Sequence, residues 1–365
     1  MPRERTRPPT IIDVAKAAGV SKSAVSRALL GQGEVSESVR QRVVEAADRL
    51  GYVANAMARG LVSERTKTLG VVLHDVTDPF AGYLHVAMQT RATELGYAVV
   101  TATNPGDLTL DNALTALRTL ISLQVDGLLV CSARFPSEQV LPFVDRLPVV
   151  AGGRRETALP SVCVDDRDGG DRLADHLLGL GHRTVAVILV DGAYSYSQHL
   201  RGVAMIARLR EAGATVVVRE VATNADVRAV LPDLVAVPDL TAIMCPNDRT
   251  QVAVMEYCRA AGVDVPGRLS VTGFDGIGPL TTSLLALTTF RQPIERIGRA
   301  SVDLMIDAIE QGAGKESSGE RGAGERGTGE RGTGERGAGE KGAGEPDQIL
   351  IRGELVPGGT VAAVR

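Results

Sequence analysis

Residues 10–27, TIIDVAKAAGVSKSAVSR, constrain this chain more than any other stretch. Thr10 precedes Asp13 by three residues, which is the capping-box spacing at the start of a helix. Gly19 suits the left-handed residue that ends a helix, and Ser21 suits the N-cap of the next one. The pattern therefore predicts two short helices joined at Gly19. Their apolar side chains should pack on one another and on the following helix: Ile12, Ala15, Val20, Val25 and Leu29.

The polar face of the second helix indicates what this helix pair contacts. In a helix-turn-helix, the first turns of the second helix enter the major groove of DNA. Arg27 can donate two hydrogen bonds to guanine, whereas Lys22 and Ser23 have less restrictive donor patterns. A plain helical hairpin would explain the apolar spacing but not this face. We therefore predict that the segment binds double-stranded DNA. Hydroxyl side chains suited to phosphate oxygens lie nearby: Thr10, Ser21, Ser26 and Ser36.

The same stretch resembles the LacI (lactose/galactose repressor) family of bacterial transcription regulators. The match continues through Val35-Ser36, Leu50-Gly51-Tyr52 and residues 55–61. The resemblance places Lys22, Ser23 and Arg27 at the base-reading positions. It also implies a homodimer, with a tetramer left open, that binds a palindromic operator.

Residues 55–61, NAMARGL, are too few to hold a helix alone in water. The resemblance implies that this segment becomes helical on DNA and enters the minor groove. There Leu61 would pry a base step apart, and Asn55, Ala58 and Arg59 would lie beside it. The alternative is an ordinary linker in which Leu61 packs on the body of the protein. The resemblance favours insertion of Leu61 into the minor groove.

The charge of the chain is unevenly distributed. The whole chain has a formal charge of −4, but residues 1–67 hold twelve Lys/Arg against seven Asp/Glu, so this part is at +5 and the rest at −9. Basic charge is thus concentrated where DNA would be met, and an acidic body limits non-specific adhesion. A length of 365 residues suits a small module plus a two-lobed body. With no Trp and 3% aromatics, the core must be built from Leu, Val and Ala.

The four cysteines, Cys131, Cys163, Cys245 and Cys258, have no paired spacing and mostly lie in apolar runs. They are interpreted as small buried hydrophobic residues, so neither a zinc site nor a disulfide framework is predicted. No metal, other cofactor or catalytic residue is expected. The N-terminus lacks the apolar segment of an export signal, and no apolar run is long enough to span a bilayer. We therefore expect a cytoplasmic protein without a membrane partner.

From Leu69 onward, short apolar runs alternate with helical stretches, which indicates parallel sheets with crossover helices. The expected strands are 69–73, 98–102, 127–131, 149–151, 162–164, 185–189, 215–221 and 242–245. The expected helices are 36–50, 80–95, 109–123, 137–145, 168–180, 197–212 and 249–261. The family resemblance extends over this body through residues 78–80, 181–183, 246–248, 270–275 and 287–293. The predicted fold is therefore an all-α helix-turn-helix head and an α/β body of two Rossmann-like lobes, of the periplasmic-binding-protein type I.

The predicted boundaries are 1–52 for the DNA-binding domain, 53–67 for a hinge and 68–365 for the ligand-binding and dimerisation body. Gly-Glu-Arg-Gly-Ala/Thr repeats of period five interrupt the body between Gly319 and Ala343. They cannot bury enough apolar surface to offset chain entropy, and their glycine spacing excludes a collagen helix. The even mixture of Glu and Arg argues against contact with nucleic acid. We expect 314–346 to be a disordered loop before one last strand over 349–355.

Ligands of open parallel sheets bind beyond the carboxyl ends of the strands. The resemblance implies a cleft between two lobes that closes on a small effector. Family members usually carry an arginine three residues before the glycine matching Gly202, but this chain has His199 there and Arg201 two residues later. A neutral sugar or related polyol is therefore favoured over an anion. The nominated effector-binding residues are Asp78, Phe80, Arg154, His199, Arg201, Asn247, Asp248, Phe274 and Asp275.

Some of these nominations have a structural alternative. Asp275 could cap a turn after Gly273, Asn247 could form an Asx-turn before the helix at 249–261, and Phe80 could belong to the core. Both interpretations remain open at this point.

The favoured function is a ligand-responsive transcriptional regulator, expected to be a repressor. Effector binding would change the angle between the lobes and so the spacing of the two hinges in a dimer. One alternative is a solute-binding protein with the same body, but the N-terminal module and the lack of an export signal speak against it. Another is an enzyme acting on a sugar or nucleoside. Against an enzyme, the sequence shows no Ser/His/Asp order of a catalytic triad, no metal-ligand cluster and no phosphate-binding glycine loop.

Overall fold

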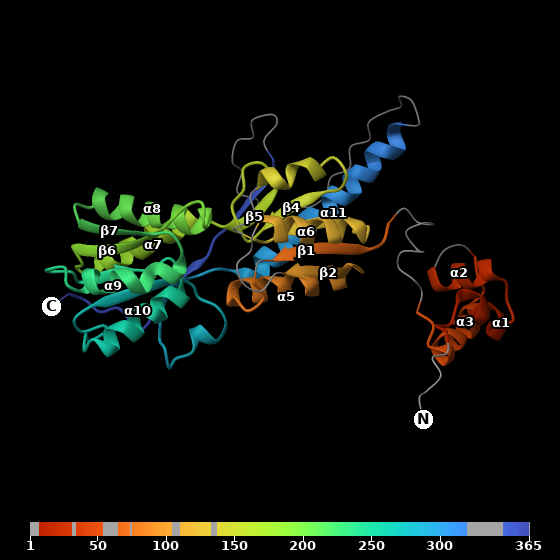
Figure 1. Ribbon diagram of the computed structural model, residues 1–365, viewed down its shortest axis with the longest axis horizontal. Helices are drawn as coiled ribbons and strands as arrows, with labels where there is room; N and C mark the ends of the chain where they lie inside the picture. The colour runs from red at the N-terminus through yellow and green to blue at the C-terminus, as the bar shows by residue number, and fades with distance from the viewer. Residues whose placement is uncertain are drawn as a thin grey trace. The chain divides into compact units, whose positions relative to one another are not determined.

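The computed structural model describes residues 7–30, 34–53, 65–73, 75–103, 110–132, 137–319 and 346–364 (Figure 1). The chain divides into two compact units, Met1–Lys67 and Thr68–Arg365. Asn55, Ala58, Arg59 and Leu61 of the predicted hinge lie outside the described residues, as does most of the Gly-Glu-Arg repeat.

The first unit contains helices α1 (Ile11–Ala18), α2 (Lys22–Leu30) and α3 (Glu37–Leu50). Gly19 ends α1 with a φ of 66°, as its position predicted. A small core of Val14, Val25 and Val43 joins the three helices. The prediction for Ile12 was wrong, because its side chain is 52% exposed. Val14 fills the core instead. Helix α1 is turned about its axis so that Val14 and Ala18, which are four residues apart and share a face, point inward.

The first lobe of the body has a sheet whose described strands follow the order β11-β5-β4-β3-β1-β2. Helices α5 and α11 cover one face and α6 covers the other, so the strands are buried on both sides and are rich in Val and Leu. The strands are β1 (Thr68–Leu73), β2 (Ala98–Thr103), β3 (Gly127–Val130), β4 (Val149–Gly152), β5 (Ser161–Val164) and β11 (Gln348–Ile351). The helices are α5 (Pro79–Glu94), α6 (Leu110–Ser122) and α11 (Ile294–Gly319).

The second lobe repeats this design with the strand order β12-β10-β9-β8-β6-β7. Helices α7 and α8 pack on one face, and α9 and α10 on the other (Figure 1). The strands are β6 (Thr184–Val190), β7 (Thr215–Val221), β8 (Ala242–Met244), β9 (Ser270–Asp275), β10 (Thr288–Arg291) and the antiparallel β12 (Glu354–Val356). The helices are α7 (Asp166–Gly179), α8 (Tyr196–Glu211), α9 (Val227–Val235) and α10 (Asp248–Ala260).

In its described part the chain passes between the lobes three times. The crossings run from β5 to α7 at Asp165, from β10 to α11 at 292–293, and from β11 to β12 at 352–353. Backbone hydrogen bonds tie the crossings to neighbouring strands: the N–H of Asp165 donates to the carbonyl of Ile351, and that of Gln292 to the carbonyl of Asp275. The lobes are therefore joined by several short segments, as the family resemblance implied.

Two predicted elements differ from the structure. The expected helix at 137–145 is replaced by two single 3₁₀ turns, Ser137–Gln139 and Leu141–Phe143, because Pro142 cannot donate the hydrogen bond that would continue a helix. The expected last strand at 349–355 is two strands in two sheets, β11 and β12. Gly353 lies at the break, where a Cβ would collide with the Arg291 carbonyl and the Phe290 ring. Helices α9 and α11 and strands β9 and β10 had not been predicted, and α11 continues to Gly319, so residues 314–319 are helical and do not belong to the predicted disordered loop.

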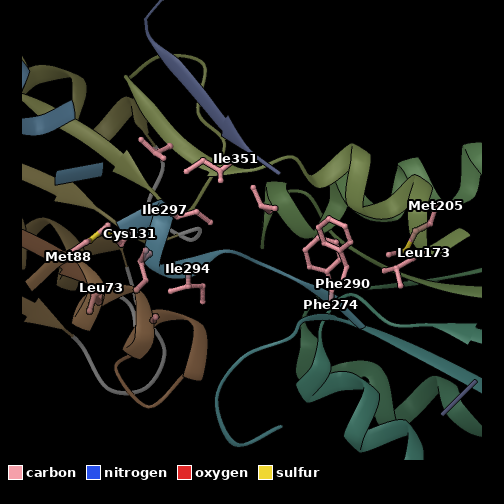
Figure 2. Packing of buried hydrophobic residues seen from close by; sticks show 14 of the residues in the cluster. Leu73, Met88, Cys131, Leu173, Met205, Phe274, Phe290, Ile294, Ile297 and Ile351 are labelled. Carbon is pink, nitrogen blue, oxygen red and sulfur yellow. Dashed lines mark hydrogen bonds between the residues drawn. The ribbon is translucent and has the colours of Figure 1, made fainter. Parts of the chain in front are cut away.

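The largest buried cluster extends through both lobes (Figure 2). In the second lobe it contains the rings of Phe274 and Phe290, which lie 5.0 Å apart with their planes at 34°. In the first lobe it contains Leu73, Met88 and Ile297. All four cysteines are buried and free, as predicted, and burial raises the pKa of the Cys131 and Cys163 thiols to about 12. No helix among the described residues is both long and apolar enough to cross a bilayer.

Gly169 allows α7 to approach the phenylalanine pair. A Cβ at this position would lie 2.7 Å from Cε2 of Phe274 and 2.9 Å from Cδ1 of Phe290. We expect Gly169→Ala to lower the free energy of unfolding by about 1–2 kcal/mol, because overpacking outweighs the gain in helix propensity. Chemical denaturation would measure this change. Gly179→Ala, in the same helix with open space around it, is the matched control. Equal stability of the two variants would contradict this interpretation of the packing.

Candidate functional site

The first candidate surface is the N-terminal part of α2. The Oγ of Ser21 accepts a hydrogen bond from the N–H of Ala24 at 3.2 Å, so the predicted N-cap is present. Lys22, Ser23 and Arg27 are exposed. Residues three and four positions apart are neighbours on a helix surface, so Ser26 lies beside Lys22 and Ser23, and Arg27 lies beside Ser23; together these side chains form one polar surface. Their role in reading bases stays a prediction.

The phosphate-contacting candidates occupy different environments. Ser36 is exposed at the N-cap position of α3, whereas Ser26 and Thr10 are half-buried. Both the N–H and the hydroxyl of Thr10 donate to Oδ2 of Asp13, at 2.8 and 2.7 Å. These hydrogen bonds, with Arg7 close by, lower the pKa of Asp13 to about 2. The predicted capping box thus fixes the start of α1 through the Asp13 carboxylate.

The second candidate site is a cavity of about 640 Å³ in the body. Its wall is formed where parallel strands of both sheets end, the place at which open α/β sheets bind ligands. Beside it the two lobes are in contact, because the N–H of Arg155 donates to Oγ of Ser197 at 3.4 Å. The first lobe contributes Asp75, Asp78, Phe80, Gly153 and Arg154, and the second contributes Ser195, Gln198, Arg201, Asn247, Asp275 and Gln292.

Six of the nine nominated effector residues line this cavity: Asp78, Phe80, Arg154, Arg201, Asn247 and Asp275. Two of them also cap helices. Oδ1 of Asp78 accepts from the N–H of Ala81 at 3.3 Å, and Oδ1 of Asn247 accepts from the N–H of Thr250 at 2.8 Å. The two interpretations left open by the sequence are therefore compatible, because a capping side chain can present its remaining polar atoms to the cavity.

The other three nominated residues lie off the cavity wall. Nδ1 of His199 donates to the carbonyl of Val190 at 2.9 Å, and His199 is not among the residues that line the cavity. Phe274 is fully buried beneath Arg201. Asp248 is also buried, and its carboxylate accepts from the N–H of Gly276 at 2.7 Å and from the hydroxyl of Thr289 at 2.5 Å. Asp248 thereby fixes the loop that follows Asp275.

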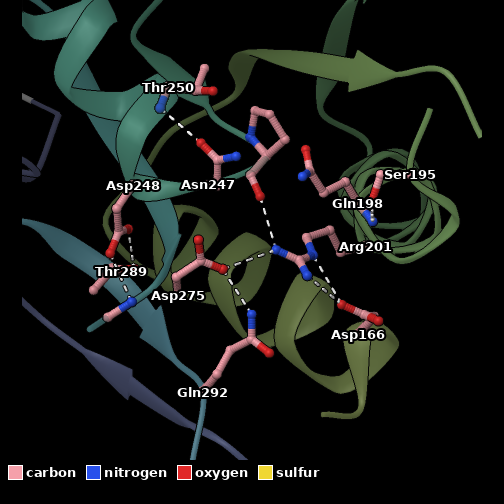
Figure 3. A network of polar contacts seen from close by, with 12 residues as sticks. Asp166, Ser195, Gln198, Arg201, Asn247, Asp248, Thr250, Asp275, Thr289 and Gln292 are labelled. Carbon is pink, nitrogen blue, oxygen red and sulfur yellow. Dashed lines mark hydrogen bonds and ion pairs between the residues drawn. The ribbon is translucent and has the colours of Figure 1, made fainter. Parts of the chain in front are cut away.

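Asp275 is the most constrained acid of the site. It ends β9 with a φ of 121°, a conformation that costs a non-glycine residue about 1–3 kcal/mol. Its Oδ1 accepts from Nε2 of Gln292 at 2.7 Å and lies 3.5 Å from Nη1 of Arg201 (Figure 3). Burial raises the pKa of Asp275, Arg201 opposes this shift, and the nearby Asp248 adds to it. Burial likewise raises the pKa of Asp248.

Arg201 holds several strand ends together. Its Nε and Nη2 contact Oδ1 of Asp166 at 2.9 and 2.8 Å, and its Nη1 donates to the carbonyl of Pro246 at 3.0 Å (Figure 3). The guanidinium carbon lies 3.7 Å from the centroid of the Phe274 ring. Arg201 is only 4% exposed, so most of its hydrogen-bonding capacity is used within the protein.

Arg154 is the matching cation of the first lobe. It follows β4, and its Nη1 donates to the carbonyl of Ser132 at 2.6 Å while Nη2 pairs with Glu156 at 2.8 Å. Burial lowers its pKa, and the charge of Glu156 opposes that change. On the same wall Arg228 pairs with Glu256 at 2.6 Å, and both side chains are exposed.

Sequence reasoning missed several wall residues. Gln292 follows β10, the neighbour of β9, so its position at the same sheet edge as Asp275 is the signal that could have found it. Ser195 and Gln198 lie at the start of α8, immediately after β6, where the same rule applies. Asp166 lies off the wall; it too follows the end of a strand, β5, but nothing in the sequence indicates its contact with Arg201, 35 positions away.

Comparison with known proteins assigns both units. Residues 10–55 match the family model described as bacterial regulatory proteins, lacI family, and residues 174–323 match a periplasmic binding protein-like domain. The chain is 30% identical over 300 residues to the transcriptional regulator DegA of Bacillus subtilis, covering 79% of this chain and 88% of DegA. It is also 30% identical over 325 residues to the regulator CelR of Thermobifida fusca, covering 84% and 93% of the two chains.

Solved structures show the same architecture. The Lac repressor dimer bound to operator and the anti-inducer ONPF superimposes with a TM-score of 0.76 at 21% identity, covering 98% of this chain and all of that one. A CelR–cellobiose complex superimposes with a TM-score of 0.61 at 25% identity, covering 96% and 99%. The helix-turn-helix unit, the two-lobed body and these similarities agree. The chain therefore belongs to the LacI family of bacterial DNA-binding transcriptional regulators.

Proposed function

We propose that this regulator is a homodimeric repressor whose affinity for a palindromic operator changes when a neutral sugar or polyol binds in the cavity. The exposed polar start of α2 and the Lac repressor dimer solved on its operator support the DNA-binding part. The relative CytR of Escherichia coli, 29% identical over 313 residues, is itself a transcriptional repressor. Lys22, Ser23 and Arg27 would read bases, and Thr10, Ser21, Ser26 and Ser36 would contact phosphates.

The charge balance of the cavity carries the proposal about the effector. Among the described residues the wall has four arginines and four carboxylates. Three of the four arginines pair with acids of the protein: Arg154 with Glu156, Arg201 with Asp275 and Arg228 with Glu256. Hydroxyl and amide groups between them offer paired donors and acceptors, which suit a polyhydroxylated neutral molecule. The CelR–cellobiose complex, in a similar fold, supports a sugar.

The three crossings are the segments about which effector binding in the cavity would change the angle between the lobes, and this change would affect the DNA-binding domain. An effector that contacts Asp78 and Arg154 on one lobe and Asn247 and Asp275 on the other bridges both lobes. It changes the angle between the lobes only if it binds one arrangement more tightly. We propose a DNA-binding domain at 1–52, a hinge at 53–67 and the effector-binding body at 68–365. The hinge would transmit the change through Asn55, Ala58, Arg59 and Leu61.

The effector would be bound and released unchanged, so we propose no catalytic role. This agrees with the relatives, which are transcriptional regulators. Acting on bacterial DNA, the protein would work in the cytoplasm.

The proposal is tested by thermal unfolding with cellobiose, galactose, ribose, glucose 6-phosphate and adenosine, followed by gel shift on DNA selected from a palindromic library. We expect one neutral sugar to raise the unfolding temperature and to change operator affinity. At a hundredfold excess over Kd, such a ligand stabilises by about 2.7 kcal/mol. Asp275→Asn should remove the thermal response. Stabilisation by glucose 6-phosphate alone would contradict a neutral effector, and sugar binding without any DNA binding would favour a solute-binding protein.

A further inference from the structure

We infer that Asp166, which does not reach the cavity, is a positioning residue: it holds Arg201, and through Arg201 it places Asp275 for the effector. The inference rests on the proposed effector cavity and names the contact that connects its wall to a crossing between the lobes.

Asp166 is placed where the first crossing enters the second lobe. It is the first residue of α7, directly after Asp165, and it is 2% exposed. The N–H of Asp165 donates to the carbonyl of Ile351 in the first-lobe strand β11 at 3.3 Å. The position of Asp166 is thus set by a segment anchored to the other lobe.

The distances show how Arg201 divides its charge between two acids. Two guanidinium nitrogens contact Asp166, at 2.8 and 2.9 Å, whereas the single contact with Asp275 is 3.5 Å long. Charge-assisted hydrogen bonds are strongest at about 2.7–2.9 Å, so Asp166 takes the larger share of the interaction. The weaker contact leaves the carboxylate of Asp275 able to accept hydrogen bonds from a ligand while still oriented by Arg201.

The same contacts reach the second crossing. Asp275 accepts from the Gln292 side chain, and its carbonyl accepts from the Gln292 backbone N–H at 2.9 Å. Gln292 begins the segment that leads to α11 in the first lobe. The row Asp166–Arg201–Asp275–Gln292 therefore joins two crossings, and its last three members line the cavity (Figure 3).

A double-mutant cycle on thermal unfolding tests this inference without any ligand. Arg201 keeps one acidic partner in either Asp166→Asn or Asp275→Asn, but in the double variant it is a buried cation with no carboxylate beside it. We therefore expect the double variant to lose more unfolding temperature than the sum of the two single shifts. Asp175→Asn is the matched control. Asp175 pairs with Arg208 at 2.6 Å between the same two helices, but both side chains are well exposed. Combined with Asp275→Asn, it should give additive shifts.

Calorimetric titration with cellobiose as the probe gives the second readout. We expect Asp166→Asn to weaken cellobiose binding at least tenfold and Asp175→Asn to leave it unchanged. Arg201→Lys is an independent variant, since an ammonium keeps the charge but cannot bridge two carboxylates as a guanidinium does. It should weaken binding as Asp166→Asn does.

Additive thermal shifts in the Asp166/Asp275 cycle would overturn the inference, as would full cellobiose affinity in Asp166→Asn. If neither cellobiose nor another sugar binds the wild-type protein, the proposed effector class fails. The thermal cycle still decides in that case whether Asp166 acts on Asp275 through Arg201.

Discussion

Replacing Arg27 with alanine is expected to weaken operator binding by roughly 30-fold to 10⁴-fold. A bidentate contact with a base contributes about 1–3 kcal/mol of discrimination, and a dimer on a palindrome would lose two of them. The variant should fold normally, because Arg27 is exposed and its one described hydrogen bond, to the carbonyl of Ser23, is long at 3.4 Å. Its binding should also become less selective at the base that Arg27 reads.

Gel shift against the selected palindromic DNA, at fixed salt, would measure this loss. Arg42→Ala is the matched control, since Arg42 is an exposed arginine on α3 rather than on the polar face of α2. We expect it to change affinity by only a few-fold, uniformly across DNA sequences. Unchanged operator affinity in Arg27→Ala would show that the start of α2 does not read the operator.

Replacing Arg201 with methionine is expected to reduce the free energy of unfolding by about 3–5 kcal/mol at pH 8, because it leaves the buried carboxylate of Asp166 and the half-buried carboxylate of Asp275 without their cation. The loss should shrink as the pH falls. Without Arg201 the folded-state pKa values of Asp166 and Asp275 rise further above those of the unfolded chain. A raised carboxyl pKa stabilises the fold at pH values below the unfolded pKa, and that stability disappears as the pH rises through the folded pKa. The deficit is therefore largest in alkaline solution.

Urea denaturation of wild type and variant at pH 5 and pH 8 would show this dependence. Arg208→Met removes an exposed arginine of the same helix that also pairs with an acid on α7, and it should cost no more than about 1 kcal/mol. A pH-independent deficit in Arg201→Met would mean that lost packing on Phe274, rather than uncompensated charge, accounts for the effect.

The parts of the molecule that were predictable depend on neighbours in sequence. The capping acid Asp13, the left-handed Gly19 and the N-cap Ser21 each interact with residues only a few positions away. The helix pair could therefore be inferred from its local sequence. Buried parallel strands such as β1 and β6 are short, uniformly apolar runs, which is why their limits were close to those found.

The parts that were missed depend on contacts between distant residues. Arg201 was nominated as an effector contact, but its strongest partner is Asp166, and nothing local to either residue indicates the pairing. His199 shows the reverse case. Its place in the family motif suggested that it lines the cavity, but its ring is hydrogen-bonded to the nearby carbonyl of Val190. The break at Gly353 followed from the close approach of β10, which the sequence around residue 353 does not reveal.

Residues 348–356 contribute a strand to each of the two sheets, and this affects the order in which the parts of the protein can fold. The edge strand β11 of the first lobe and β12 of the second both come from this segment, so neither sheet is complete until it has left the ribosome. The Gly-Glu-Arg repeat lies between α11 and β11 and delays that moment by about 1–5 s at ordinary rates of synthesis. The helix-turn-helix unit has its own core and can fold long before. A nascent chain would thus contain a folded helix-turn-helix unit before it contains the folded two-lobed body that regulates this unit.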